Sequence, residues 1–131
     1  MEKAVALAGQ VDETLGAAQG KLMKAQAGLE EIDVKAATAM VINSLKEGFG
    51  FTSEVIEESP KKSVFRCGRC PIYEAGQMMG MDAETIENQC RVGPFKYMDA
   101  MVKQLNPKLS YQLKKFRESA GGHCEEMIEM S

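Results

Sequence analysis

The sequence pattern of this chain changes near residue 50 from one that favours helices to one that favours short strands, and this change limits the folds that the chain can adopt. Residues 2–31 are rich in Ala, Glu, Lys, Leu and Gln, which favour helices. A second helical segment follows Asp33, a suitable N-cap, and ends near Gly48-Phe49-Gly50. Beyond it, residues 52–58 and 62–66 are predicted to be two short strands. The chain therefore begins helical and continues with sheet.

The remaining residues predict three more helices and a second hairpin. Helices are expected from Pro71, from residue 83 to 90, and after Gly93-Pro94. Residues 109–114 alternate apolar and polar side chains, and residues 123–130 can form the return strand after a turn at 119–122. The predicted fold is α+β, with N-terminal helices and an antiparallel sheet of two hairpins that carries helices on one face.

The length of 131 residues suits one domain over residues 1–131. Residues 1–50 form its helical N-terminal part, and residues 51–131 form an α+β part that holds every cysteine. Gly16 and Gly20 weaken the first helical segment, which is expected to be either two helices or one weak helix.

Charge and hydropathy exclude several classes of protein. A net charge of −3 gives no reason to expect nucleic-acid binding, and no apolar run is long enough to cross a membrane. Residues 61–117 nevertheless carry eleven Lys and Arg against five Asp and Glu, which could attract an anion or form a solvated basic surface. With no signal-peptide pattern at the N-terminus, we expect a cytoplasmic protein with reduced thiols.

Four cysteines carry the most specific chemical signal. Cys67 and Cys70 form a C-x-x-C pair at the end of a predicted strand, Cys90 ends a predicted helix, and Cys124 begins the last strand. A C-x-x-C loop brings two sulfur atoms within reach of one metal ion or cluster. We therefore expect Cys67, Cys70, Cys90 and Cys124 to converge as the ligands of a metal centre.

The spacing leaves the identity of that centre open. One C-x-x-C pair with two single cysteines favours a [4Fe–4S] cluster over zinc, because structural zinc sites more often combine two closely spaced pairs. Without a metal, Cys67 and Cys70 could be a redox dithiol, and Cys90 and Cys124 small core residues.

Two further side chains near Cys124 are candidates for proton transfer. His123 is the only histidine, and it could shuttle a proton or lie at the rim of the sheet. Neighbours on a strand point to opposite faces, so His123 and Cys124 should not bind one metal together unless a bulge intervenes. The glutamates Glu125, Glu126 and Glu129 could include a general acid or base, or form the solvated face of an edge strand.

From Arg69 onward the chain resembles a known family. The residues concerned are Cys70-Pro71-Ile72-Tyr73, Gly80, Cys90, Gly93, Asn106-Pro107-Lys108-Leu109 and the ending Gly121-Gly122-His123-Cys124-Glu125. They are similar to the L-2-amino-thiazoline-4-carboxylic acid hydrolase-like family and, at the final motif, to 4-vinyl reductase-like domains. The resemblance covers roughly residues 50–131. Cys67 is additional, and the aromatic residue usual two places after the last cysteine is Glu126 or Met127 here.

The resemblance implies hydrolytic opening of a small cyclic, sulfur-containing amino acid, by cleavage of a C–N bond in a cyclic amidine. It further suggests that Cys70, Cys90 and Cys124 hold three irons of a cubane whose fourth iron acts as a Lewis acid. Cys67 would then be the fourth ligand or a catalytic thiol beside that iron, and His123 a second catalytic residue.

Several functions therefore remain as hypotheses. The first is an iron–sulfur or other metal-binding domain that acts on or senses a small molecule. The others are a redox sensor, metal sensor or electron carrier without its own substrate, a metal-free thiol hydrolase with a cysteine nucleophile, and an interaction module. For partners, we expect a small-molecule ligand, no nucleic acid and no membrane. The amphipathic N-terminal helices could also pair into a homodimer.

Overall fold

The structure is a computed structural model that describes residues 2–119 and 121–131, without the side chains of residues 2 and 5. Its helices are α1 (Glu2–Ala27), α2 (Val34–Phe49), α3 (Pro71–Met78), α4 (Ala83–Val92) and α5 (Pro94–Leu105). Its strands are β1 (Ser53–Glu58), β2 (Lys62–Cys67), β3 (Leu109–Lys115) and β4 (Cys124–Met130). This order of elements confirms the α+β prediction.

The strands form one antiparallel sheet in the order β1-β2-β4-β3. Each predicted hairpin is present, and the two hairpins join through the pairing of β2 with β4. β4 is therefore an inner strand, so the interpretation of its glutamates as an edge-strand face is wrong. At one end of the ladder, Cys67 lies directly opposite Cys124.

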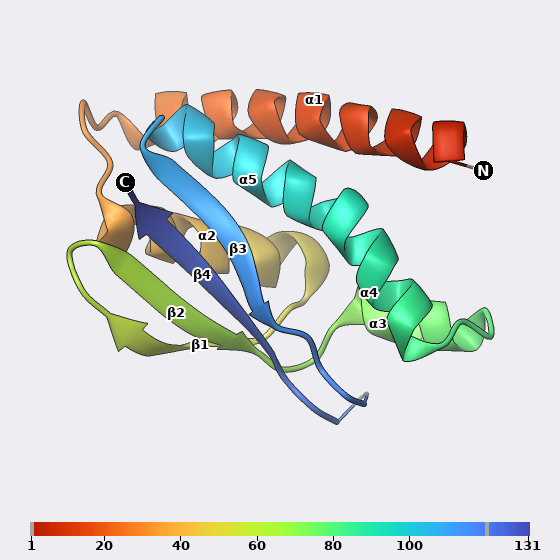
Figure 1. Ribbon diagram of the computed structural model, residues 1–131. Coiled ribbons are helices and arrows are strands. Elements are labelled where there is room, and N and C mark those ends of the chain that lie inside the picture. Colours follow the sequence, from red (N-terminus) through yellow and green to blue (C-terminus); the bar gives the residue numbers. More distant parts are fainter. Residues whose placement is uncertain (1, 120) are drawn as a thin grey trace.

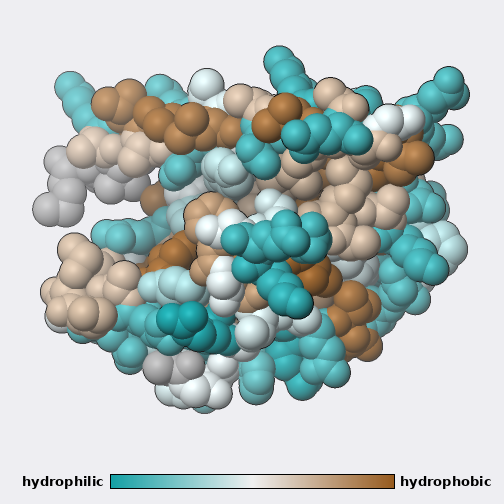
Figure 2. Space-filling view, turned by 180° about the vertical axis from the view of Figure 1, so that it is seen from behind, coloured by the Kyte–Doolittle hydropathy of each residue, from teal (hydrophilic) through white to brown (hydrophobic). Residues whose placement is uncertain are grey.

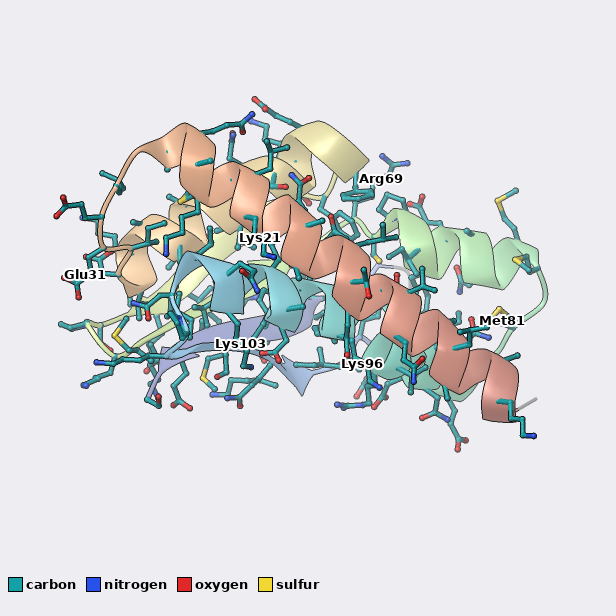
Figure 3. All side chains as sticks on the ribbon, turned by 90° about the horizontal axis from the view of Figure 1, so that it is seen from above. Lys21, Glu31, Arg69, Met81, Lys96 and Lys103 are labelled. Carbon is teal, nitrogen blue, oxygen red and sulfur yellow. The ribbon has the colours of Figure 1, made fainter. Side chains whose placement is uncertain are left out.

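All helices that contact the sheet cover the same face of it (Figure 1). α2 packs on β2 and β4, and α5 packs on β3. α1 does not lie on the sheet but runs along α5, so it forms a further layer above α5 (Figures 1 and 3). α3 and α4 lie beyond the sheet, near the end where the chain leaves β2 (Figure 1).

The glycines of α1 have a packing role that their helix propensity does not reveal. α1 is a single helix of 26 residues, so the prediction of two helices or one weak helix is corrected. Gly9, Gly16 and Gly20 face α4 and α5, where an added Cβ would lie 2.7 Å from Val92 O, 2.1 Å from Tyr97 O and 2.4 Å from Met101 O. A side chain at these positions would force the helices apart.

Local signals at the element ends act as expected. The Asp33 side chain accepts from the amide of Ala36 at the start of α2, and Gly50 adopts the left-handed conformation that ends it (φ 75°). Several bounds differ from the prediction: β1 begins at Ser53, β2 continues to Cys67, α4 extends past Cys90 to Val92, β3 continues to Lys115, and β4 begins at Cys124 rather than at residue 123. The predicted turn at 119–122 includes Ala120, which lies outside the described residues.

The core lies between the sheet and α2 and α5. Phe65, Tyr111 and Ile128 point from adjacent strands toward buried residues of the helices, such as Val41 and Val102. Cys67 and Cys124 belong to this cluster, whereas Cys90 packs with Tyr73 and Ile86 in a smaller one. Among the helices described, none combines the length and apolar character needed to cross a membrane.

Candidate functional site

Four cysteines line one cavity at the end of the sheet that faces α3 and α4. The cavity has a volume of about 260 Å³, and its walls include Cys67, Cys70, Cys90 and Cys124. The fold thus brings together thiols that are separated by up to 57 positions in the sequence, from residue 67 to residue 124.

Each thiol is positioned by a different structural element. Cys67 ends β2 and Cys124 begins β4, so both side chains leave the same face of the sheet as direct neighbours. Cys70 is the N-cap of α3, where its sulfur accepts from the Tyr73 amide at 3.4 Å. Cys90 reaches the cavity from the last turns of α4.

Burial keeps most of these sulfur atoms protonated. It is the main cause that raises the pKa of Cys67 and Cys70 above the ordinary value of 9.0, and it raises the pKa of Cys90 to about 12. Glu126 adds to the effect at Cys67, since a nearby carboxylate disfavours a thiolate. At neutral pH these three cysteines are therefore thiols.

Arg117 brings a buried positive charge to the same cavity. Its side chain lies in the loop after β3 and is 2% exposed. Nε donates to Cys124 Sγ at 3.3 Å, and the two Nη atoms donate to the carbonyl oxygens of Cys67, Gly68 and Gly122. The guanidinium also lies 5.6 Å from the centre of the Tyr73 ring. Arg117 consequently joins the end of β2 to the start of β4 through hydrogen bonds from one charged group.

Glu126 is the buried carboxyl group of the site. It follows Cys124 by two positions on β4, so both side chains point into the cavity. The Tyr111 hydroxyl donates to Glu126 Oε1. Burial raises the pKa of Glu126 above its ordinary 4.5, an effect that hydrogen bonds and the charge of Arg117 oppose only in part. This carboxyl group holds its proton at a higher pH than an exposed glutamate.

The rest of the wall is largely apolar and aromatic. It includes Tyr73, Phe95, Met98 and Phe116. Tyr73, three positions after Cys70, lines the same cavity as the cysteines. Its neighbour Glu74 does not, because that side chain pairs with Arg69 at 3.2 Å on the surface, where Figure 3 shows Arg69 pointing outward.

The predicted metal centre and the predicted role of His123 both differ from what the structure shows. Within residues 2–119 and 121–131, no three His, Cys, Asp or Glu side chains are grouped closely enough to hold one metal ion. His123 is exposed and lines a separate polar hollow with Arg66, Lys115 and Glu118. The structure thus places His123 away from the cysteine cavity, on the opposite side from Cys124, as strand alternation predicts.

Sequence reasoning missed Arg117 and gave Glu126 only as one of three glutamates. Arg117 lies between two lysines and a glutamate in a polar stretch, and nothing in that stretch marks it as buried. The signal for Glu126 was its spacing of two from Cys124, together with its place where the family usually has an aromatic residue.

Comparison with known families agrees with the sequence motifs. The family model described as L-2-amino-thiazoline-4-carboxylic acid hydrolase matches residues 1–126. The chain belongs to this family. The match begins at the N-terminus, so the L-2-amino-thiazoline-4-carboxylic acid hydrolase family includes the helical first third as well as the motifs found from residue 69 onward. No curated protein and no solved structure matches the chain.

Proposed function

We propose that this chain is a thiol-dependent hydrolase that opens a small cyclic amidine at a C–N bond inside the cysteine cavity. The observation that carries the proposal is the meeting of four cysteines with Arg117 and Glu126 in one cavity. Family membership supports hydrolysis of a cyclic, sulfur-containing amino acid as the reaction. A reducing compartment such as the cytoplasm, which would keep the thiols free, is part of the proposal.

The cavity has the features needed to hold a small carboxylate. Its walls are mostly apolar, and a volume of about 260 Å³ suits a molecule the size of an amino acid. A guanidinium has five N–H groups, and Arg117 uses four of them in its four hydrogen bonds to the protein. The fifth N–H and the buried positive charge can bind the carboxylate of the ligand.

Cys124 is the proposed nucleophile. The Cys124 thiol adds to the amidine carbon and passes its proton to the ring nitrogen, and the ring C–N bond then breaks as this nitrogen takes a second proton from Glu126. Water adds to the same carbon, the bond from that carbon to the Cys124 sulfur breaks, and the two protons of the water return to Cys124 and Glu126. The raised pKa of Glu126 suits a group that must donate a proton near neutral pH.

Ring opening can be followed by mass spectrometry. Protein incubated with 2-aminothiazoline-4-carboxylate should give a product heavier by one water molecule. Cys124→Ser should lower the rate at least about 100-fold, the scale expected when a nucleophile is lost. His123→Ala is the matched control, because the exposed His123 lies outside the cavity, and this variant should keep the rate. Full activity in Cys124→Ser, with a native circular dichroism spectrum in both variants, would refute the proposal.

A metal centre is the second candidate function. Four cysteine thiolates are a suitable ligand set for a [4Fe–4S] cluster or for zinc, and all four cysteines line the same cavity. Cys67, Cys70, Cys90 and Cys124 would hold the group, which would supply a Lewis acid or an electron-transfer centre when bound. Within residues 2–119 and 121–131 no three of these sulfur atoms are grouped closely enough to hold one ion, so binding would require them to move closer together.

Anaerobic purification tests this second candidate. A brown protein with iron, sulfide and broad absorption near about 400 nm would support the cluster, and colourless protein with one zinc per chain would support zinc. A cluster-bearing protein without ring-opening activity would be a sensor or electron carrier. Metal-free protein that opens the ring would leave the thiol hydrolase as the function.

We further propose that α1 pairs with α1 of a second copy. The outer side of α1 carries a stripe with the 3–4 spacing of a coiled coil (Figure 2), made of Ala8, Val11, Leu15, Ala18, Leu22 and Ala25. Its large members are half exposed or more, whereas the glycine side of α1 is already packed on α5. The stripe contains no charged residue, so pairing with itself places no like charges together.

Sedimentation tests the pairing. The protein should be a dimer, and Leu22→Glu should shift it to a monomer, because the charge would lie in the seam. Met79→Glu, at an exposed position outside the stripe, is the control and should stay dimeric. A wild-type protein that stays monomeric at high concentration would contradict the pairing.

A further inference from the structure

We propose that Cys67 and Cys124 form a reversible cross-strand disulfide when a small peroxide enters the cavity. The C-x-x-C motif alone suggests that Cys67 would pair with Cys70. The structure offers a different partner, because Cys67 and Cys124 form the last residue pair of the β2–β4 ladder.

Strand geometry brings the two sulfur atoms within bonding reach. Directly opposite residues of an antiparallel pair have Cα atoms about 4.5 or 5.5 Å apart. Both values lie within the range of about 4.4–6.8 Å that a disulfide requires. The Cys67 and Cys124 side chains lie on the same face of the sheet, are 1% and 7% exposed, and line the same cavity. No shift in strand register is needed to join them.

Arg117 holds this pair of residues in place. Its Nη2 donates to the Cys67 carbonyl at 3.2 Å, its Nη1 donates to the carbonyls of Gly68 and Gly122, and its Nε donates to Cys124 Sγ. The two strand ends are thereby fixed to one rigid guanidinium group. The Nε contact of Arg117 is made to the Cys124 sulfur and not to the Cys67 sulfur, so we assign Cys124 as the sulfur that reacts first.

The oxidation has two steps. The Cys124 sulfur attacks one peroxide oxygen, an S–O bond forms, the O–O bond breaks, and the leaving hydroxide takes the thiol proton to become water. The Cys67 sulfur then attacks the sulfenic sulfur, an S–S bond forms, the S–O bond breaks, and the hydroxyl group leaves with the Cys67 proton as a second water. Two sulfurs are oxidised and one peroxide is reduced. Glu126 lines the same cavity and acts on the pKa of the Cys67 thiol, so it can carry that proton.

One consequence rests on the proposed function. A disulfide would consume the Cys124 nucleophile, so peroxide should stop ring opening and a dithiol reductant should restore it. The formation of the disulfide does not depend on any turnover.

Peptide mapping of the full-length protein tests the pairing. The protein is reduced, freed of reductant, treated with hydrogen peroxide, alkylated and digested with trypsin. Trypsin separates the cysteines into peptides 67–69, 70–91 and 118–131, because Arg66, Arg69, Arg91 and Arg117 precede the cuts. We expect peptide 67–69 linked to 118–131, with a loss of two hydrogen atoms (about 2 Da) that dithiothreitol reverses.

Matched variants make the result specific. Cys67→Ser should lose the link, whereas Cys70→Ser and Cys90→Ser should keep it. A link from 67–69 to 70–91, or oxidation of Cys124 to sulfinic acid with Cys67 left as a thiol, would overturn the proposal. If the link forms and no ring opening is found, the disulfide stands and the hydrolase proposal fails. If ring opening is found and the link is not, the hydrolase proposal stands and the disulfide proposal fails.

Discussion

Arg117 shows how much of this site depends on one residue. Its guanidinium is buried and donates to three carbonyls and one sulfur, at the point where β2 and β4 separate. Removing it would leave buried carbonyl oxygens without donors, and each such loss costs about 1–3 kcal/mol.

We therefore expect Arg117→Met to lower the free energy of unfolding by about 3 kcal/mol or more. Arg66→Met is the matched control, because Arg66 is exposed on β2, and it should change stability by less than about 0.5 kcal/mol. Urea denaturation of both variants measures the difference. Equal stabilities for the two variants would contradict the role given to Arg117.

Glu126 should give the protein a pH dependence of known sign. Its folded pKa is raised above the ordinary 4.5, so above pH 4.5 the unfolded chain releases the proton first. This group therefore makes stability fall as the pH rises from 4.5 to its folded pKa, with no further change above that. Below pH 4.5 the stabilising effect is fully present.

Glu126→Gln should remove this loss of stability with rising pH. The variant keeps an amide oxygen that can accept the hydrogen bond from the Tyr111 hydroxyl. Unfolding measured between about pH 4 and 8 should show the variant gaining on the wild type as the pH rises. Glu129→Gln, on the other face of β4, serves as the control and should run parallel to the wild type. A Glu126→Gln protein that loses stability relative to the wild type as the pH rises would show that the sign is wrong.

The sequence identified the cysteines of the site but not the charges around them. A C-x-x-C pair and two further cysteines stand out in any reducing context. Arg117 becomes buried only through its hydrogen bonds to the ends of β2 and β4, and Glu126 only through the alternation along β4, and a single sequence contains no signal for the hydrogen bonds of Arg117. His123 is the only histidine and belongs to the closing sequence motif, but strand alternation directs its side chain to the face opposite that of Cys124.

At the level of elements, α1 depends on close contact with α5. A Cβ added at Gly16 would lie 2.1 Å from Tyr97 O. This oxygen belongs to the backbone, so it cannot move away through a change of side-chain rotamer. Gly48 in α2 has open space around its Cβ position. An alanine at Gly16 therefore tests both helix propensity and packing, whereas an alanine at Gly48 tests helix propensity alone.

We expect Gly16→Ala to destabilise the protein by about 1–3 kcal/mol, because overpacking outweighs the better helix propensity of alanine. Gly48→Ala should stabilise it by about 0.5–1 kcal/mol for the propensity alone. Thermal unfolding of both variants gives the comparison. A stabilised Gly16→Ala protein would mean that α1 does not pack closely on α5.

The element order was predictable because its signals are local. Asp33, Gly50, Pro71 and Asp82 mark helix ends through their own backbone and capping preferences. The continuity of α1 was not predictable in this way. Gly16 and Gly20 are needed because α1 packs closely on α5, which lies about 80 positions later in the sequence. Hydrophobic periodicity predicts which face of a helix is buried but not how closely two helices approach.

At the scale of the whole molecule, the sheet fixes the positions of two of the four cysteines that line the cavity. The β2–β4 pairing brings Cys67 to Cys124, while the return of the chain through α3 and α4 places Cys70 and Cys90 above that sheet end. Residues of α1 and α5, such as Leu15 and Phe95, line the same cavity from the helix layer. The site is thus a product of the whole fold rather than of one motif.

All four thiols open into a single cavity, which we propose binds one small carboxylate. Alkylation of each cysteine, followed by mass spectrometry at increasing concentrations of 2-aminothiazoline-4-carboxylate, measures this directly. We predict that the ligand slows modification of Cys67, Cys70, Cys90 and Cys124 with one shared half-maximal concentration. Protection of only some of them, or no protection at concentrations that support ring opening, would contradict the account.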